Sequence, residues 1–270
     1  MLIFKSINKL NKEVNFKAKI GFVPTMGCLH KGHISLIKSS KKICKKTLVS
    51  IFVNPSQFNK YSDLRNYPKN LKKDLKILKK YKVDYLLLPN TKEIYKKKKD
   101  RKIKLSKNDK ILCAKFRPGH FEGVLAVINQ FLYNFKPKYI FFGEKDYQQL
   151  FLVKNFIKKK FKAKVVSCST VRDNNKVALS SRNILLSKND IKKSSFIAKL
   201  LLKFKIDLKK NILVKKKIKN LFFKINNIKN IKVEYLEIRN KKSLLKNYNK
   251  NNFKIFLAYY NKKVRLIDNY

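Results

Sequence analysis

The stretch that decides the fold is GFVPTMGCLHKGHISLIKSS, residues 21–40. It opens with a short apolar run that ends at Pro24, which predicts a buried strand. Apolar residues then recur at helical spacing, which predicts a helix over residues 32–46. The stretch contains two of the chain's three histidines and three of its six glycines. In an open parallel sheet, ligands bind beyond the carboxyl ends of the strands, so the loop between strand and helix is the first candidate site.

The alternation of strand and helix signals continues outward from this stretch. Further strands are predicted in TLVSIFVN (47–54), VDYLLLP (83–89), KYIFFGEKD (138–146) and KAKVVSCST (162–170). Helices are predicted in PKNLKKDLKILKKY (68–81), FEGVLAVINQFLYNF (121–135) and YQQLFLVKNFIKKKF (147–161). Strands that are unbroken apolar runs separated by helices indicate a parallel sheet with both faces covered. The Lys-rich segment 96–110 is expected to be a mobile surface loop.

The last part of the chain has a different pattern, because all six glycines and all six prolines precede residue 144. Ser187 and Asp190 have the spacing of a capping box, which predicts the start of a long helix. Alternating strands are then expected in IKVEYLEI (231–238), FKIFLAYY (253–260) and KVRLID (263–268). We therefore predict an α/β protein with a Rossmann-like, doubly wound parallel sheet at residues 1–173. A smaller C-terminal α+β domain is predicted at residues 174–270.

The net charge of +52 is the most conspicuous property of the composition. A basic surface favours nucleic acid as a partner. Here the excess is nearly all Lys, and Arg, the residue suited to forked contacts with phosphate and guanine, occurs only seven times. Because the lysines are spread along the whole chain with abundant Asn and Ile, we attribute them to an A/T-biased genome. No specific nucleic-acid partner is expected.

The cysteines and the apolar runs indicate the compartment. Four cysteines (Cys28, Cys44, Cys113 and Cys168) are scattered without a C-x-x-C pair, which is typical of reduced thiols in a cytosolic protein. No apolar run reaches 18 residues, and the N-terminus lacks the apolar core of a secretory signal. We expect a cytoplasmic protein that has no membrane contact.

The two histidines of the opening stretch have the chemistry of a phosphate site. A lone histidine is more often a surface or core residue, but His30 and His33 lie three positions apart at the predicted helix start. Their rings can share one side, next to unpaired backbone N–H groups and the positive end of the helix dipole. Gly27 and Gly32 allow the backbone to approach a ligand closely. This corner is therefore expected to bind phosphate.

The residues HKGH match the H-x-G-H signature of the nucleotidylyltransferase superfamily. The wider pattern resembles the pantothenate synthetase (pantoate–β-alanine ligase) family much more closely. The motifs that carry this resemblance run through almost the whole chain: VPTMGCLHKGHISLI, VSIFVNPSQF, YPKNLKKDL, RPGHFEGV, FFGEKDYQQL, TVRD, LSSRN and RLIDN. The resemblance implies a nucleotidylyltransferase-type sheet and an ATP-dependent, AMP-forming ligation of pantoate to β-alanine. Another enzyme of the superfamily, acting on a different carboxylic acid, and a nucleic-acid-binding protein with relic motifs are the competing interpretations.

The resemblance also implies roles for individual residues. His33, His30, Lys145 and Arg182 are the expected catalytic residues, with His33 as the usual proton-donor candidate. The expected ATP-binding residues are Met26, Gly27, Cys28, Leu29, His30, Lys31, Gly32, His33, Gly143, Glu144, Lys145, Asp146, Val171, Leu179, Ser180, Ser181 and Arg182. Gln57 and Gln149 are expected to bind pantoate, because a carboxamide can both donate to and accept from a hydroxy acid.

Supporting residues and partners follow from the same resemblance. Asn54 and Phe58 are expected to shape the pantoate pocket, and His120 is expected to support it. Mg²⁺ is expected to arrive with ATP, but its protein ligands are unknown: Asp74 is the nearest carboxylate, and it equally suits the polar face of its helix. The N-terminal domain is expected to bind ATP and pantoate, the C-terminal domain to act as a lid, and the protein to be a homodimer.

The chain departs from the family pattern at two positions. Lys31 replaces the usual glutamate between the histidines, and we expect this side chain to point away from the phosphates. Asn261 stands where a glycine is usual, which puts lid closure and packing in question more than the chemistry.

Overall fold

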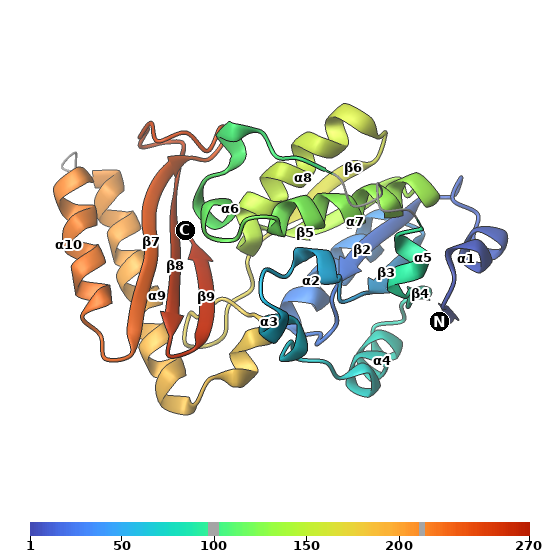
Figure 1. Ribbon diagram of the computed structural model, residues 1–270, viewed down its shortest axis with the longest axis horizontal. Helices are drawn as coiled ribbons and strands as arrows, with labels where there is room; N and C mark the ends of the chain where they lie inside the picture. Colours follow the sequence, from blue (N-terminus) through green and yellow to red (C-terminus); the bar gives the residue numbers. More distant parts are fainter. Residues whose placement is uncertain (97–102, 211–213) are drawn as a thin grey trace. The chain divides into compact units, whose positions relative to one another are not determined.

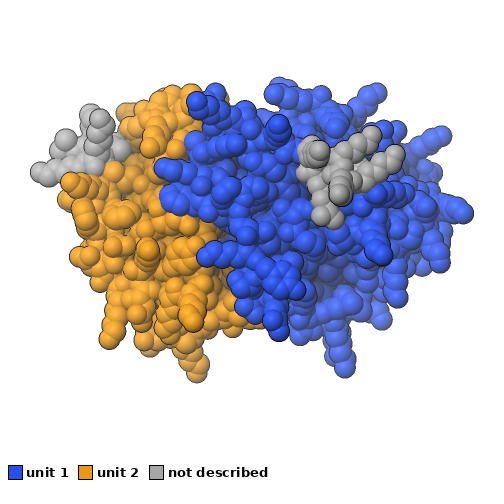
Figure 2. Space-filling view, in the orientation of Figure 1, with its two compact units in different colours: residues 1–170 blue, residues 171–270 orange. Residues whose placement is uncertain are grey.

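The computed structural model describes residues 1–96, 103–210 and 214–270. The chain divides into two compact units, Met1–Thr170 and Val171–Tyr270, which Figure 2 shows in different colours. Residues 97–102 of the segment that was predicted to be a mobile loop lie outside the described residues. Its remaining part contains a short 3₁₀ turn, η3 (Lys107–Asp109).

The first unit contains six parallel strands and the helices that connect them (Figure 1). The strands are β1 (Leu2–Phe4), β2 (Ile20–Thr25), β3 (Lys46–Ile51), β4 (Tyr85–Leu87), β5 (Tyr139–Gly143) and β6 (Lys164–Cys168). The α-helices are α1 (Ile7–Glu13), α2 (Lys31–Ile43), α3 (Tyr61–Arg65), α4 (Leu71–Lys80), α5 (Thr91–Ile94), α6 (Leu112–Phe116), α7 (His120–Asn134) and α8 (Tyr147–Lys160). Two further 3₁₀ turns, η1 (Pro55–Gln57) and η4 (Glu144–Asp146), follow β3 and β5.

The strand order is β1-β4-β3-β2-β5-β6, and every described pair is parallel. From β2 the chain moves outward through β3 to β4, and it then returns to place β5 on the other side of β2. This reversal is the topological switch point at which doubly wound sheets bind their ligands. The predicted fold class is confirmed.

The strand β2 shows why both sheet faces are buried. Phe22 points to one face, where its ring makes edge contacts with Phe131 and Phe135 of α7 at centroid distances of 5.3 and 5.0 Å. The next residue, Val23, points to the opposite face and packs in a cluster with Ile37 of α2 and Leu78 of α4. Phe22 and Val23 point to opposite faces, and both are apolar and fully buried. The sequence of β2 is therefore an unbroken apolar run.

Several predicted boundaries need correction. The helix predicted over residues 32–46 ends at Ile43, because Cys44 is extended and Lys46 already begins β3. The strand predicted to reach Asn54 ends at Ile51, because the Asn54 side chain caps η1 by accepting from the Ser56 N–H. The strand β1 and the helix α1 were not predicted, since three strand residues and a seven-residue helix give too little periodicity.

The second unit packs two helices against an antiparallel sheet. Its elements are η5 (Ser181–Leu185), α9 (Lys188–Lys210), α10 (Val214–Asn226), β7 (Ile231–Asn240), β8 (Phe253–Asn261) and β9 (Val264–Asn269). The predicted capping box at the start of α9 is confirmed: Asp190 N donates to Ser187 Oγ at 3.2 Å, and Ser187 N donates to Asp190 Oδ2 at 3.3 Å. The predicted antiparallel sheet is confirmed, with order β7-β8-β9.

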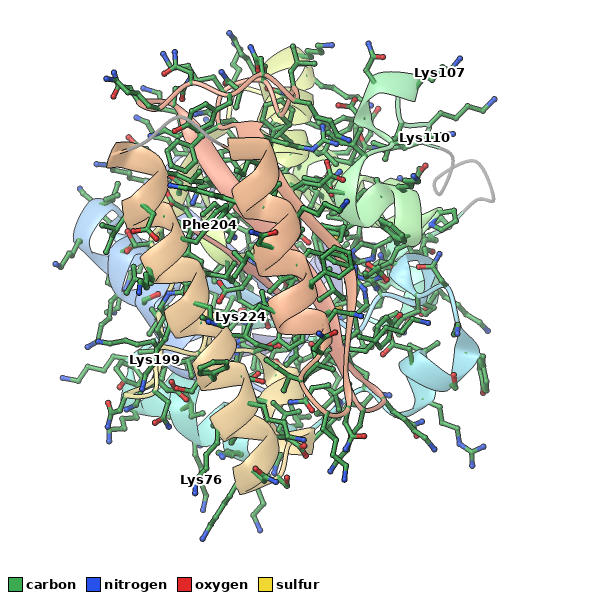
Figure 3. The ribbon with its side chains drawn as sticks, turned by 90° about the vertical axis from the view of Figure 1, so that its left-hand side faces the viewer. Lys76, Lys107, Lys110, Lys199, Phe204 and Lys224 are labelled. Carbon is green, nitrogen blue, oxygen red and sulfur yellow. The ribbon has the colours of Figure 1, made fainter. Side chains whose placement is uncertain are left out.

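The core of the second unit joins α9, α10 and the sheet. Leu201 and Leu208 of α9, Ile225 of α10, and Ile255 and Leu257 of β8 are all almost fully buried in it. In Figure 3, which draws the side chains as sticks, Phe204 lies on α9 within this core, whereas Lys199 of α9 and Lys224 of α10 are exposed. Each helix of this unit therefore has an apolar face toward the core and lysines in solvent.

Candidate active site

The switch point brings two loops of the first unit together. β2 and β5 are neighbours, and each ends at the same edge of the sheet, β2 at Thr25 and β5 at Gly143. The loop from Met26 to the start of α2 leaves this edge from β2, and the turn η4 leaves it from β5. The predicted residues of the motifs MGCLHKGH and GEKD therefore lie at one edge of one sheet.

The two imidazoles cap the N-terminus of α2 reciprocally. His30 Nδ1 accepts from the Gly32 N–H at 3.1 Å, and His33 Nδ1 accepts from the His30 N–H at 3.3 Å. The ring centroids are 4.2 Å apart. Since each Nδ1 accepts a hydrogen bond, the neutral rings carry their protons on Nε2. Both rings are thus prepared to donate from Nε2 to an anion.

Gly32 is required for this arrangement. A Cβ atom at this position would lie 2.8 Å from Cε1 and 2.9 Å from Nδ1 of His30. An alanine would push the His30 ring away from the helix terminus that it caps. The glycine of H-x-G-H therefore makes space for the first histidine.

The backbone N–H groups of residues 27–30 and of Gly32 already have acceptors within the chain, so the corner leaves fewer of them for a ligand than the sequence suggested. Asp74 Oδ2 accepts from Cys28 N at 2.8 Å, and Asp74 Oδ1 accepts from Leu29 N at 2.7 Å. Gly27 N donates to Thr25 Oγ1 at 3.2 Å. With the imidazoles accepting from residues 30 and 32, the Nε2–H groups of the side chains become prominent donors that the corner offers to a phosphate.

Asp74 has a role that the sequence did not reveal. Its side chain is 2% exposed, so it does not lie on the polar face of α4, and both of its oxygens hold the loop after β2. Burial raises the pKa of this carboxyl, and the two N–H donors oppose that rise. Gly27, at φ +79°, passes close by, and a Cβ there would lie 3.0 Å from Asp74 Oδ2. The following residue, Cys28, also has a positive φ of 50°.

The electrostatics of the corner keep both imidazoles neutral. Burial, and after it the charge of Lys145, lower the pKa of His30 to about 4, and Asp146 opposes this shift. The pKa of His33 is held well below its usual range by burial, by His30 and by Lys145. The Lys145 ammonium also pairs with Asp146 at 3.2 Å. A cation and two neutral N–H donors therefore share the site, which suits a polyanionic ligand.

The predicted pantoate readers come from two elements at the same edge. Gln57 is 7% exposed at the end of η1, and its Nε2 contacts Met26 Sδ, at the beginning of the corner. Gln149 is half-buried in the first turn of α8, directly after η4. Its neighbour Gln148 is buried and donates to the Ile111 carbonyl at 2.7 Å, so Gln148 holds a loop in place.

The remaining predicted residues belong to the second unit. Leu179 N donates to the Val171 carbonyl at 3.0 Å, so the motifs TVRD and LSSR face each other across a hairpin-like turn. Ser180 Oγ caps η5 by accepting from the Arg182 N–H at 3.2 Å, and Ser181 is buried. The structure thus groups these residues with one another, and it groups the histidines, Lys145 and the glutamines within the first unit.

A second group that sequence reasoning missed fastens this turn. The Arg172 guanidinium forms a forked pair with Asp268, with both N–O distances at 2.8 Å, and it lies 4.0 Å from the Tyr270 ring centroid. Arg172 is one of only seven arginines in a lysine-rich chain, and this scarcity was the signal available for it.

The two departures from the family pattern have clear local structures. Lys31 is exposed at the first position of α2. Asn261 is fully buried at the end of β8, where its Nδ2 donates to the Asp190 carbonyl at 2.9 Å and to Ser194 Oγ at 3.3 Å. The amide therefore ties the sheet of the second unit to the start of α9.

Searches for metal-binding clusters and membrane spans concern the described residues alone. Among them, no three or more His, Cys, Asp or Glu side chains are grouped as a metal site. None of the helices in the described ranges combines the length and the apolar character that crossing a membrane requires.

Comparison with known proteins gives matches along the whole chain. The family model described as pantoate-beta-alanine ligase matches residues 2–270. A pantothenate synthetase of Francisella philomiragia is 41% identical, covering 100% of this chain and 97% of the relative. One from Leptospira biflexa is 40% identical, covering 93% of this chain and 90% of the relative.

Solved structures agree with the fold. The crystal structure of pantothenate synthetase from Thermus thermophilus superposes with a TM-score of 0.93 at 30% identity, covering 100% of this chain and 99% of that one. The crystal structure of pantoate-beta-alanine ligase from Francisella tularensis, complexed with beta-gamma ATP and beta-alanine, superposes with a TM-score of 0.86 at 38% identity. This match covers 100% of this chain and 97% of that one. This chain belongs to the pantoate–β-alanine ligase family.

Proposed function

We propose that the protein condenses pantoate with β-alanine at the expense of ATP, through a pantoyl-adenylate intermediate, to give pantothenate, AMP and pyrophosphate. The observation that carries this proposal is the group of two neutral Nε2–H imidazoles and the Lys145 ammonium at the switch point of the sheet. Family membership and the ATP and β-alanine bound by the Francisella tularensis relative support it.

In the first step, a pantoate carboxylate oxygen attacks the α-phosphorus of ATP, and the bond from that phosphorus to the bridging oxygen of the β-phosphate breaks. The attacking group and the triphosphate are both anionic, so the site must neutralise charge and hold them in line. His30 and His33 donate from Nε2 to phosphate oxygens, and Lys145 supplies a positive charge. These donors gain strength as charge moves onto the leaving pyrophosphate.

The other predicted residues complete the binding of both substrates. Gln57 and Gln149 hold the hydroxyls and carboxylate of pantoate, and Asp146 holds the ribose hydroxyls. Ser180, Ser181 and Arg182 bind the β- and γ-phosphates, where a forked guanidinium is well suited. Val171 lines the adenine pocket. The second unit acts as a lid over the nucleotide.

In the second step, the β-alanine amine attacks the acyl carbon of the adenylate. The bond from that carbon to the phosphate oxygen breaks, AMP leaves, and the amine proton passes to solvent. Mg²⁺ would enter with ATP and would neutralise part of the phosphate charge, and Asp74, whose oxygens hold the N–H groups of Cys28 and Leu29, serves the loop in this scheme.

The cellular setting is also part of the proposal. We expect a cytoplasmic homodimer. The four free cysteines are consistent with a reducing compartment, and the homodimer rests on the family resemblance.

The test measures AMP release from ATP with purified protein. Release should require both pantoate and β-alanine, and His33→Ala and Lys145→Ala should each lower pyrophosphate formation by about 10²–10³-fold while leaving the folded fraction unchanged. Lys154→Ala, which removes an exposed lysine of α8, is the matched control and should behave as the wild type.

Two results would contradict the proposal. Equal AMP release with other carboxylic acids would indicate a different adenylylating enzyme of the superfamily. Nucleic-acid binding with a steep salt dependence and no AMP release would indicate a binding protein.

A further inference from the structure

We propose that Gly123 and His120 of α7 are positioning residues that fix the carboxamide of Gln57 and thereby set the affinity for the hydroxy acid. The inference deepens the proposed function and rests on it. Neither residue is expected to touch a substrate. They act through the backbone of η1, the turn that carries Gln57.

The helix α7 approaches the backbone of η1 closely at Gly123. A Cβ atom at this position would lie 2.2 Å from the Ser56 carbonyl oxygen, 2.5 Å from its carbon and 2.8 Å from the Gln57 nitrogen. All three are backbone atoms, so no side chain can rotate away to make room. Any residue other than glycine would lift the turn and move Gln57 with it.

Asn54 fastens the same turn and also ties it to α7. It is 1% exposed, and its Nδ2 donates to the Gly123 carbonyl at 3.0 Å and to Gln57 Oε1 at 3.3 Å. Its Oδ1 accepts from Ser56 N at 3.2 Å and from Tyr95 Oη at 3.0 Å. The bond to Oε1 orients the Gln57 carboxamide, because the oxygen faces the Asn54 donor and Nε2 faces Met26.

His120 holds the backbone of Gln57 itself. Its Nδ1 lies 2.7 Å from the Gln57 carbonyl oxygen, and its Nε2 lies 2.9 Å from an Arg117 guanidinium nitrogen. Because a guanidinium only donates, Nε2 must be the acceptor, which leaves Nδ1 protonated to donate to Gln57. Arg117 thus fixes the tautomer of His120, and in that tautomer His120 donates a hydrogen bond to the turn.

These contacts explain why RPGHFEGV accompanies NPSQF. A carboxamide that must donate to one substrate oxygen and accept from another works only in one orientation. A small displacement of a positioned group can cost about a hundredfold in rate or affinity. The contacts of Asn54, His120 and Gly123 fix the orientation of Gln57 for pantoate. The ATP-binding corner is held by other residues.

The experiment compares KM values for pantoate and ATP in pyrophosphate exchange. Gly123→Ala should raise the KM for pantoate at least about tenfold and leave the KM for ATP within about twofold. Alanine is the better helix former, so the substitution does not weaken α7 through propensity. Phe131→Leu, which disturbs the packing of the same helix against Phe22, is the control and should leave both KM values unchanged.

A second pair of variants keeps the test valid if Gly123→Ala fails to fold. The Asn amide nitrogen can occupy the place of His120 Nδ1, so His120→Asn should retain a pantoate KM within about threefold of the wild type. His120→Leu has a similar size but no donor, and it should raise that KM about tenfold.

Each outcome decides between two ideas. Equal rises in the KM for pantoate and ATP, or identical behaviour of His120→Asn and His120→Leu, would overturn this inference and leave the proposed function standing. A wild-type protein without pantoate-dependent exchange would overturn the proposed function, and this inference with it.

Discussion

Two of the loops that carry predicted phosphate ligands are held by different means. The loop at residues 26–33 uses Gly27, with a φ of +79°, and a buried carboxylate, Asp74, that accepts two backbone N–H groups. The turn at residues 171–182 contains no glycine. It is fastened by a side-chain ion pair between Arg172 and Asp268.

The two loops differ in which groups have to approach one another. In the first loop, backbone approaches a carboxylate and an imidazole, so only glycine leaves enough space at positions 27 and 32. In the second, the long Arg172 side chain covers the distance to Asp268, so the chain needs no glycine there, and the one positive φ of the turn, 67°, is adopted by Lys176. In both loops the chain's own side chains engage backbone N–H groups, and the expected ligands for phosphate are side chains. Substrate binding should therefore be sensitive to side-chain identity.

The largest effect is expected when Asp74 is removed. Asp74→Ala leaves the N–H groups of Cys28 and Leu29 without their acceptor, which should lower the free energy of unfolding by about 3 kcal/mol. Pyrophosphate exchange should fall about a hundredfold, because the imidazoles follow this loop. Urea unfolding and exchange rates measure both, and the exposed acid variant Glu13→Ala serves as control.

Asp74→Asn sharpens the comparison, since its carbonyl oxygen can still accept one of the two bonds. It should lie between the wild type and Asp74→Ala in both measurements. If exchange is lost in Asp74→Ala while stability is unchanged, then Asp74 contacts substrate or metal, and the loop is not held as described.

A smaller effect is expected at the second turn. Arg172→Ala breaks a forked pair whose side chains are 20% and 9% exposed, and the free energy of unfolding should fall by about 2 kcal/mol. Arg172→Lys should recover less than half of this, because a lysine cannot form the fork or stack on Tyr270. The KM for ATP should rise about tenfold if the turn binds phosphate.

The exposed pair of Lys46 and Asp84 provides the control for this prediction. Lys46 is 52% exposed, so Lys46→Ala should leave stability without a measurable change. An Arg172→Ala protein as stable as the wild type would show that the turn is held by its backbone bonds alone, and the contrast between the two loops would disappear.

The order of strands and helices could be predicted because most elements are long and regularly patterned. β2, β3 and β5 are continuous apolar runs, and the capping box at Ser187 is a local signal. β1 is only three residues long, so its pairing with β4 depends on a partner more than 80 residues away, which no local pattern reveals.

The candidate site was predictable only for residues within motifs. The histidines, Lys145 and the glutamines stand out by type and spacing, whereas Asp74 shows its role only through contacts with residues 45 and 46 positions earlier. Arg172 likewise meets Asp268 across 96 residues. Such long-range partners require the fold. The expectation of free N–H groups at the corner missed the engagement of Cys28 and Leu29 for the same reason, since their acceptor Asp74 is distant in sequence.

The smallest expected effect concerns the pH dependence of the first loop. The pKa of His30 is lowered to about 4 in the folded protein, and an exposed imidazole has a pKa of about 6.5. As pH falls below 6.5, the unfolded chain binds this proton first, so folding stability is full above that pH and is lost toward pH 4. Asn is a good N-cap and its oxygen can accept from Gly32, so His30→Asn should keep the helix terminus and remove the titration.

Urea unfolding at pH 7 and pH 5 measures the difference. Between pH 7 and pH 5, the free energy of unfolding of the wild type should fall by about 1 kcal/mol more than that of His30→Asn. The full shift of the His30 pKa would give about twice this difference, but the ring is partly exposed and solvent weakens the effect. Equal losses would mean that His30 titrates normally. The phosphates would then meet a largely protonated ring in mildly acidic solution, and the corner would attract ATP by charge instead of by directed Nε2–H donors.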